Sequence, residues 1–272
     1  MNPFVSIIIV THNSQTELNR CIEAIDCQSV QPGQLIVVDS GSDDTSYLES
    51  LADRDDCSLL KFENIGYGAG NNRGLQVVDS RCDFVLIINP DTFLTKSAIE
   101  DALRVLKTMP EVAILSGVLE GYDLQGTGPT GTIDSSGVFR AWYGRWYDRG
   151  MGTRVTDVHY KPGYIPAVCG AFMFCRLSAV SSELPEFFDE SFFMYKEDIE
   201  LCLRLSGKGW KCYFSPDVRA YHCRGWGQRR RSVSRTCKLL SAENEIRIYR
   251  KHPSIYMAWA GLKYFLVRYL NM

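Results

Sequence analysis

An acidic side chain directly follows one of the most apolar runs of this chain. Residues 84–88 are apolar throughout, and Asn89, Pro90 and Asp91 come next. If the run is a strand of an open α/β sheet, Asp91 lies at the carboxyl end of that strand, where the ligands of such sheets gather. A carboxylate there suits Mg²⁺ or Mn²⁺ that also holds a phosphate. Proline and aspartate are equally ordinary in turns and helix caps, so the motif alone indicates either a metal site or a turn.

Polar side chains also follow the first two apolar runs. Residues 4–10 lead into Thr11 and Asn13, and the second run ends at Asp39. A carboxylate in the position of Asp39 can accept the imide N–H of a uracil or thymine ring, and we favour a binding role because the run before it is otherwise apolar. Asp43 fits two roles equally well, since it can bind ribose hydroxyls or cap the next helix.

A glycine-rich loop, residues 64–74, follows the third apolar run and opens a predicted helix. Glycines such as Gly66 allow close backbone approach, and the amides of the loop can face an anion. The dinucleotide fingerprint GxGxxG belongs in the first βα turn of a sheet. This loop is the third turn and has Asn71 in place of the last glycine, so a Rossmann dehydrogenase is disfavoured.

Two adjacent acids, Glu197 and Asp198, stand at the start of a predicted helix over residues 197–206. Acids in a first helical turn are favoured by the helix dipole, which is a sufficient structural reason for them. A catalytic interpretation requires one carboxylate to take a proton from a hydroxyl nucleophile. The residues alone leave both interpretations open.

A single histidine, His222, comes shortly before Trp226 and an arginine triplet that begins at Arg229. These residues fit a mobile lid that places cations over a diphosphate. In that arrangement His222 is a candidate metal ligand. The alternative is an ordinary polar residue with its hydrogen bonds satisfied.

The elements that must position these residues alternate in type through the first half of the chain. Predicted strands cover residues 4–10, 34–39, 58–62, 83–88 and 112–116, and predicted helices cover residues 14–27, 43–52, 68–78 and 97–108. Such alternation predicts an α/β fold with a mostly parallel sheet flanked by helices. Residues 120–166 are rich in Gly and aromatics, and we expect an insertion over the working edge of the sheet. The remaining predictions are regular structure over 167–174, a strand over 210–214 and helices over 234–251 and 255–270.

Charge and cysteine content indicate the compartment of the protein and the kind of partner it has. The ten cysteines form no CxxC pair, and the first residues lack the basic segment of a signal peptide, so we expect a reduced, cytoplasmic protein. Residues 222–272 hold 11 Lys/Arg and only two acids, which predicts an anionic partner for this end of the chain: active-site phosphates, acidic lipid or nucleic acid. The predicted helix over 255–270 is too short and too charged to span a bilayer comfortably, but it can lie on anionic lipid or dock on protein.

Taken in order, these motifs resemble those of the inverting GT-A glycosyltransferases of family two, and most closely the bacterial rhamnosyltransferase-type members. The resemblance covers roughly residues 4–227 and rests on residues 5–13, 37–45, 64–72, 89–91 and 197–198, with His222. It implies a GT-A fold with a Rossmann-like sheet and C-terminal helices. The implied catalytic domain spans 1–230, with a nucleotide-sugar half over 1–119 and an acceptor-binding and catalytic half over 120–230. A helical extension over 231–272 follows.

The resemblance also implies roles for individual residues. Asp198 would be the catalytic base with Glu197 beside it, and Asp91 and His222 would hold Mg²⁺ or Mn²⁺. The implied donor-binding residues are Thr11, Asn13, Asp39, Asp43, Gly66, Asn71, Asn72, Asn89 and Arg229. The implied acceptor-binding residues are Trp142, Gly170, Ala171 and Trp226. Asn89 stands where the DxD motif has its first aspartate, so we expect the metal to arrive mainly with the donor.

The implied reaction moves a sugar from a nucleoside diphosphate to an acceptor hydroxyl with inversion. L-Rhamnose from TDP-rhamnose is the preferred donor, a UDP-hexose is the alternative, and the expected acceptor is a glycan or a polyprenyl-diphosphate-linked glycan of bacterial surface polysaccharide synthesis. A catalytically silent nucleotide-sugar or glycan-binding protein and a nucleotidyltransferase are the rivals. We expect no nucleic acid partner, and both a homodimer and peripheral contact of residues 255–270 with the inner face of the cytoplasmic membrane are compatible with the sequence.

Overall fold

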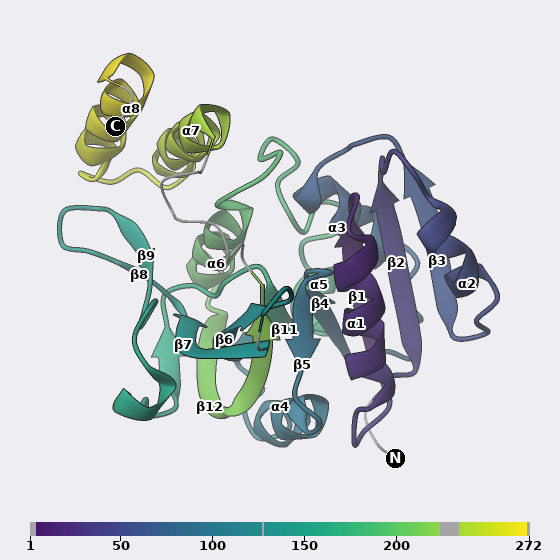
Figure 1. Cartoon of the computed structure of the whole chain (residues 1–272). Coiled ribbons are helices and arrows are strands. Elements are labelled where there is room, and N and C mark those ends of the chain that lie inside the picture. Colours follow the sequence, from purple (N-terminus) through teal and green to yellow (C-terminus); the bar gives the residue numbers. More distant parts are fainter. Residues whose placement is uncertain (1–3, 127, 224–233, 271–272) are drawn as a thin grey trace.

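The computed structural model describes residues 4–126, 128–223 and 234–270, and its centre is a ten-stranded mixed sheet (Figure 1). Eight strands run in the order β10 (Gly163–Ile165), β12 (Lys211–His222), β6 (Val112–Asp123), β11 (Phe172–Arg176), β4 (Phe84–Ile88), β1 (Val5–Thr11), β2 (Gln34–Ser40) and β3 (Cys57–Phe62). Two further strands lie off this path: β5 (Thr92–Leu94) pairs with β12, and β7 (Gly128–Ser135) pairs with β6. The mostly parallel α/β sheet expected from the sequence is confirmed.

The N-terminal strands form the parallel part of the sheet. Strand β1 lies between β4 and β2 and is parallel to both, and β2 is parallel to β3. Every residue of β1 and β4 is buried, as expected for strands covered on both faces. Thr11 pairs in register with Asp39, so the polar residues at the ends of β1 and β2 are neighbours.

Helices cover both faces of this sheet and connect its strands. They are α1 (Gln15–Asp26), α2 (Glu49–Ala52), α3 (Tyr67–Leu75), α4 (Ala98–Leu106), α5 (Leu177–Ser181) and α6 (Glu197–Gly207), with short 3₁₀ turns at Ser46–Leu48 and Val155–Asp157. The glycines of α3 have a packing function, because a Cβ added at Gly70 would lie 2.8 Å from Val10 and one at Gly74 would lie 2.7 Å from Ile8. Part of the glycine-rich loop is therefore explained by the close approach of α3 to β1.

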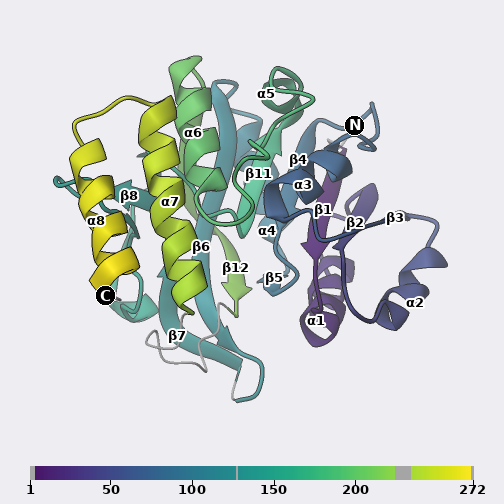
Figure 2. The same ribbon diagram turned by 90° about the horizontal axis from the view of Figure 1, so that it is seen from above.

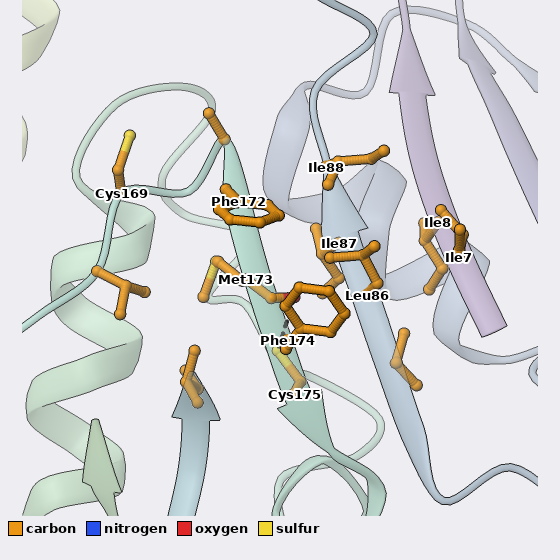
Figure 3. Packing of buried hydrophobic residues seen from close by; sticks show 14 of the residues in the cluster. Ile7, Ile8, Leu86, Ile87, Ile88, Cys169, Phe172, Met173, Phe174 and Cys175 are labelled. Atoms are coloured by element: carbon orange, nitrogen blue, oxygen red, sulfur yellow. Dashed lines mark hydrogen bonds between the residues drawn. The ribbon is translucent and has the colours of Figure 1, made fainter. Parts of the chain in front are cut away.

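Strand β11 joins the two halves of the sheet. It is antiparallel to both β4 and β6, and its aromatic residues Phe172 and Phe174 are fully buried. Figure 3 shows these rings beside Ile87 and neighbouring side chains of β4. Because β11 runs against its neighbours, its first residues lie at the same edge of the sheet as the last residues of β4 and β1.

The second half departs from the expected boundaries. Strand β11 begins at Phe172 rather than at residue 167, and β12 continues to His222 rather than ending at residue 214. The stretch over 120–166 is largely β structure: it contains β7, the hairpin β8 (Val138–Arg140) with β9 (Trp146–Asp148), and β10. Glycines with positive φ, including Gly137, Gly144 and Gly150, turn the chain between these strands. Because these turns interrupt the strands, the sequence pattern did not indicate them.

Two C-terminal helices, α7 (Arg235–Lys251) and α8 (Met257–Leu270), pack against each other and lie beside α6 (Figure 2). Their buried side chains Ile248, Tyr249 and Ala260 belong to the same hydrophobic cluster as the sheet. The helices predicted over 234–251 and 255–270 are confirmed. In the part of the chain that the structure describes, none of the helices has the length and apolar content needed to cross a membrane.

Candidate active site

Two cavities open at the edge of the sheet where β1, β2, β4 and β12 end and β11 begins. The smaller has a volume of about 340 Å³ and the larger about 840 Å³. Four residues line both of them: Tyr67, Asn89, Asp91 and Met194. The motif at residues 89–91 therefore lies at the junction of the two cavities, as a site shared by two substrates requires.

Of the expected donor-binding residues, Thr11, Gly66 and Asn89 line the smaller cavity, whereas Asn13, Asp39 and Asp43 do not. Thr11 is buried, and its hydroxyl lies 3.1 Å from the Tyr47 hydroxyl. His12, which the sequence argument did not assign, also lines this cavity and contacts the Ser40 carbonyl at 2.9 Å.

Asp39 is buried next to Thr11 and lines neither cavity. Its Oδ2 accepts a bond from the Ser42 amide at 3.3 Å, whereas Oδ1 has no hydrogen-bond partner among the described residues. A buried acceptor without a partner is costly to stability, so Oδ1 is a candidate acceptor for a ligand N–H group.

Asn13 and Asp43 hold each other at the exposed rim of this region. The Asn13 amide donates to Asp43 Oδ2 at 3.0 Å, and the Asp43 backbone amide donates to Asn13 Oδ1 at 2.8 Å. Asn13 has a left-handed backbone with φ of 51°, which asparagine tolerates better than most residues. The expected pair is brought together, and its carboxylate stays open to solvent.

Asn71 and Asn72 are turned into the protein interior by α3, and neither lines a cavity. The Asn72 side chain donates to the Phe188 carbonyl at 2.8 Å and accepts from the Phe188 amide at 2.9 Å. Asn71 donates to the Tyr67 carbonyl at 3.0 Å. Asn72 thus anchors the Phe188 backbone, and Asn71 bonds within its own helix, so neither reaches either cavity in this structure.

Asp91 and His222 meet at the junction of the cavities, and both line the larger one. His222 Nε2 lies 3.3 Å from Asp91 Oδ1, and His222 Nδ1 lies 2.8 Å from Asp134 Oδ2. Two cis ligands at about 2.1 Å from an octahedral ion are about 3 Å apart, so Asp91 and His222 fit one divalent ion. A carboxylate behind the imidazole is the usual orienting partner of a metal-binding histidine.

Asp134 was missed by the sequence argument because it sits in β7, far from any recognised motif. Among the described residues, no group of three or more His, Cys, Asp or Glu side chains is arranged to enclose a metal. Phosphate oxygens of a donor are suitable further ligands for a divalent ion at this position. Burial lowers the pKa of His222, but the carboxylates of Asp91 and Asp134 outweigh this and raise the pKa to about 9. Metal binding would therefore release a proton from this imidazole.

Asp198 is fixed at the start of α6 and faces the larger cavity. Its Oδ2 accepts from the Gly170 amide at 2.8 Å, and its Oδ1 accepts from the Ile199 amide at 2.8 Å. Burial raises the pKa of Asp198 above its ordinary value, although the two amides act in the opposite direction. A carboxylate with a raised pKa and a fixed orientation is suited to accept a proton.

Glu197 also lines this cavity but is more deeply buried than Asp198. Burial, reinforced by the charge of Asp198, raises the pKa of Glu197 to about 8. At neutral pH Glu197 is therefore mostly protonated. The pair thus combines an uncharged acid with a carboxylate anchored by two amides.

The expected acceptor residues divide into two groups. Gly170 and Ala171 line the larger cavity, and a Cβ at Gly170 would lie 3.4 Å from the Asp198 side chain. Trp142 is 87% exposed at the tip of the β8–β9 hairpin and does not line this cavity. Trp146, on the adjacent strand, lines the cavity instead. Trp226 and Arg229 lie outside the described residues.

Basic side chains from the C-terminal helices form a further wall of the larger cavity. Lys238 and Lys263 line it together with Lys196, which directly precedes Glu197. The buried carboxylate of Glu245 pairs with Lys196 at 3.3 Å and with Lys263 at 2.6 Å. Lys196 and Lys263 share the one carboxylate of Glu245, and Lys238 adds a further positive charge to this wall.

The sequence model described as "Glycosyl transferase family 2" matches residues 6–183. The chain belongs to glycosyl transferase family 2. This match ends before α6, so Glu197, Asp198 and His222 of this glycosyltransferase lie beyond the matched segment. Their place in the site rests on the geometry described above.

Characterised relatives of this family 2 glycosyltransferase act in glycan synthesis. It is 23% identical over 244 residues to an N-acetylglucosaminyl-diphospho-decaprenol L-rhamnosyltransferase of Mycobacterium tuberculosis, covering 82% of this chain and 76% of the relative. It is 28% identical over 207 residues to a low-salt glycan biosynthesis hexosyltransferase of Haloferax volcanii, covering 74% of this chain and 61% of the relative.

Solved structures confirm the expected GT-A fold. GalNAc-T7 with UDP, GalNAc and Mn²⁺ superposes with a TM-score of 0.74 at 13% identity, covering 97% of this chain but only half of that one. A mannosyltransferase from Pyrobaculum calidifontis, in complex with GDP-Man and Mn²⁺, superposes with a TM-score of 0.63 at 14% identity. That match covers 98% of this chain and 70% of the other.

Proposed function

We propose that this glycosyltransferase moves a sugar from a nucleoside diphosphate to an acceptor hydroxyl with inversion at the anomeric carbon. The observation that carries the proposal is the position of Asp198, which two backbone amides hold in the larger cavity while Asp91 marks the junction with the smaller one. The nucleotide would occupy the smaller cavity and the acceptor the larger one. The reacting atoms would then meet between Asp91 and Asp198.

The donor half of the site supports a pyrimidine nucleotide. Asp39 Oδ1, which has no partner among the described residues, is suited to the imide N–H of the base. Asp43, which Asn13 holds at the rim, would bind the ribose. Mg²⁺ or Mn²⁺ would be held by Asp91 and His222, and when bound it would offset the charge that develops on the departing diphosphate.

The acceptor half supplies the base for the transfer. Asp198 would take the proton from the acceptor hydroxyl as its oxygen bonds to the anomeric carbon, while the bond from that carbon to the diphosphate breaks and its electrons leave with the diphosphate. The amides of Gly170 and Ile199 fix the carboxylate and leave it able to accept one further hydrogen bond. Protonated Glu197 adds no second negative charge beside it.

We further propose L-rhamnose from TDP-rhamnose as the transferred sugar and a lipid-diphosphate-linked glycan as the acceptor. The named activity of the mycobacterial relative supports both choices. The wall formed by Lys196, Lys238 and Lys263 supports an acceptor that carries phosphate, because these lysines face the cavity that contains Asp198. A UDP-hexose donor is the alternative within the same reaction.

A donor panel tests the proposal directly. The purified chain is incubated with Mn²⁺, a synthetic N-acetylglucosaminyl-diphosphate lipid and TDP-rhamnose, UDP-glucose or GDP-mannose, and products are read by mass spectrometry and NMR. Release of free TDP together with a glycosylated lipid of inverted configuration is expected. Release of pyrophosphate would indicate a nucleotidyltransferase. Nucleotide binding without any turnover on the panel would favour a silent binding protein.

We also propose that α8 contacts an anionic membrane surface. Leu262, Phe265 and Tyr269 are each more than half exposed on its outer side, and Arg268 lies beside them. An apolar face with adjacent cations is typical of interfacial helices. In a sedimentation assay, the wild type should pellet with phosphatidylglycerol vesicles, whereas Phe265→Glu should stay in the supernatant. Loss of a dimer in that variant, without any vesicle binding by the wild type, would instead indicate a subunit interface.

A further inference from the structure

The two residues directly before Glu197 and Asp198 have an unfavourable backbone conformation. Tyr195 has φ of 74° and Lys196 has φ of 71°, so two consecutive non-glycine residues are left-handed. Each such residue is uncommon and is retained only where its surroundings impose it. Helix α6 begins at the next residue, Glu197. The direction in which Asp198 enters the cavity therefore depends on whatever holds this pair.

One face of α7 contacts the segment of residues 189–195, and the two run in opposite directions. Lys251 pairs with Asp189, and Arg247 donates to the Ser191 carbonyl. Further along, the Asn244 amide donates to the carbonyls of Met194 at 2.9 Å and Tyr195 at 2.8 Å. Positions 244, 247 and 251 share a helical face. Helix α7 therefore holds this segment over most of its length, with Asn244 at the strained end.

Glu245 holds the second strained residue through its side chain. It is fully buried, and its Oε2 lies 3.3 Å from Lys196 Nζ and 2.6 Å from Lys263 Nζ of α8. A buried charge of this kind is tolerated only when it is paired. Lys196 is thus tied to both C-terminal helices directly before α6 begins.

We propose that Asn244 and Glu245 are positioning residues for the transfer: they hold Tyr195 and Lys196 left-handed and thereby place Asp198 against Gly170. The proposal rests on the function proposed above for Asp198. It assigns the C-terminal helices a part in the reaction, although neither residue touches the reacting atoms. Neither residue lines a cavity, so their removal should change the rate of transfer and not the binding of donor.

Asn244→Ala removes both carbonyl contacts from the strained pair. We expect kcat to fall on the order of 10- to 100-fold, since small misplacements of a reacting group have effects of this size. The dissociation constant for TDP with Mn²⁺, measured by calorimetry, should stay within about twofold of the wild type. Measuring both well below the unfolding midpoint separates this effect from loss of folded protein.

A glycine at residue 195 provides the rescue, because Asn244 bonds the Tyr195 carbonyl directly. Glycine adopts positive φ without strain, so Tyr195→Gly in the Asn244→Ala background should recover about tenfold in kcat. A role of Asn244 confined to stability predicts no recovery, because the glycine adds no contact. Unchanged kcat in Asn244→Ala, or a double variant no faster than the single one, would overturn the proposal.

Glu245→Gln tests the second contact with a matched control. It keeps the shape of the side chain but removes the charge that pairs with Lys196 and Lys263, and we expect kcat to fall about tenfold. Glu243→Gln makes the same change on the same helix at a residue that lines neither cavity, and should leave kcat unaltered. Equal effects of the two variants would contradict the proposal. A wild type that binds no nucleotide would contradict the proposed function instead.

Discussion

The donor and acceptor halves of the site are built in different ways. In the donor half, Thr11, Asp39 and Asn89 come directly at or after the ends of neighbouring parallel strands, so the sheet itself brings them together. The groups proposed for chemistry are instead fixed by hydrogen bonds, Asp198 by the amide of Gly170 and His222 by Asp134. Donor binding would therefore rest on the register of neighbouring strands, whereas the groups for chemistry depend on hydrogen bonds between separate elements.

The sharpest way to break this comparison is to remove one carboxylate from each half. Asp198→Asn should reduce kcat by about 10³-fold or more, since a general base contributes 10²- to 10⁴-fold. Asp39→Ala should weaken TDP binding about 10- to 100-fold through the loss of a hydrogen bond to a charged acceptor. Steady-state kinetics and calorimetry measure the two effects. Retained turnover in Asp198→Asn would remove it from the role of base.

Asp134→Asn tests the contact between Asp134 and His222, and Asp134 itself is not expected to contact a substrate. The substitution removes the carboxylate that orients His222, and loss of such a partner typically weakens metal binding 10- to 100-fold. Titration of activity with Mn²⁺ should show this shift, and saturating Mn²⁺ should restore most of kcat. An unchanged Mn²⁺ requirement would show that His222 does not hold the metal.

Because of Glu197, in the acceptor half, the free energy of unfolding should depend on pH. The pKa of Glu197 is about 8 in the folded protein and close to 4.5 when exposed, so the folded state binds the extra proton between these values. The free energy of unfolding should therefore fall as pH rises from about 4.5 to about 8. Urea unfolding at several pH values should show a flatter dependence for Glu197→Gln than for wild type. The same slope in wild type and in Glu197→Gln would contradict a raised pKa of Glu197.

The smallest expected effects concern the two tryptophans of the β8–β9 hairpin. Trp146 lines the larger cavity, so Trp146→Ala should raise the KM for acceptor several-fold, because ring contact with a sugar contributes roughly 1 kcal/mol. Trp142 is exposed outside the cavity, and Trp142→Ala should leave the KM within about twofold. The reverse order would mean that the acceptor extends over the hairpin tip.

The sequence predicted the donor half better because its signals are local. An apolar run ending in a polar residue locates a strand and its ligand edge at once, and Asp39 and Asp91 were identified in this way. Asp134 carries no such signal, since its partner His222 lies 88 residues later. Asn71 and Asn72 had the expected sequence context but point into the core, because α3 presents another face to the cavity. Asn244 and Glu245 could not be identified from the sequence either, because they hold a backbone conformation.

The two cavities meet at Asp91, yet most of the residues that line one do not line the other. In the proposed reaction the nucleoside diphosphate would form at this junction and would leave through the smaller cavity, while the lengthened acceptor would remain in the larger one. A fresh donor would then enter without displacing the acceptor.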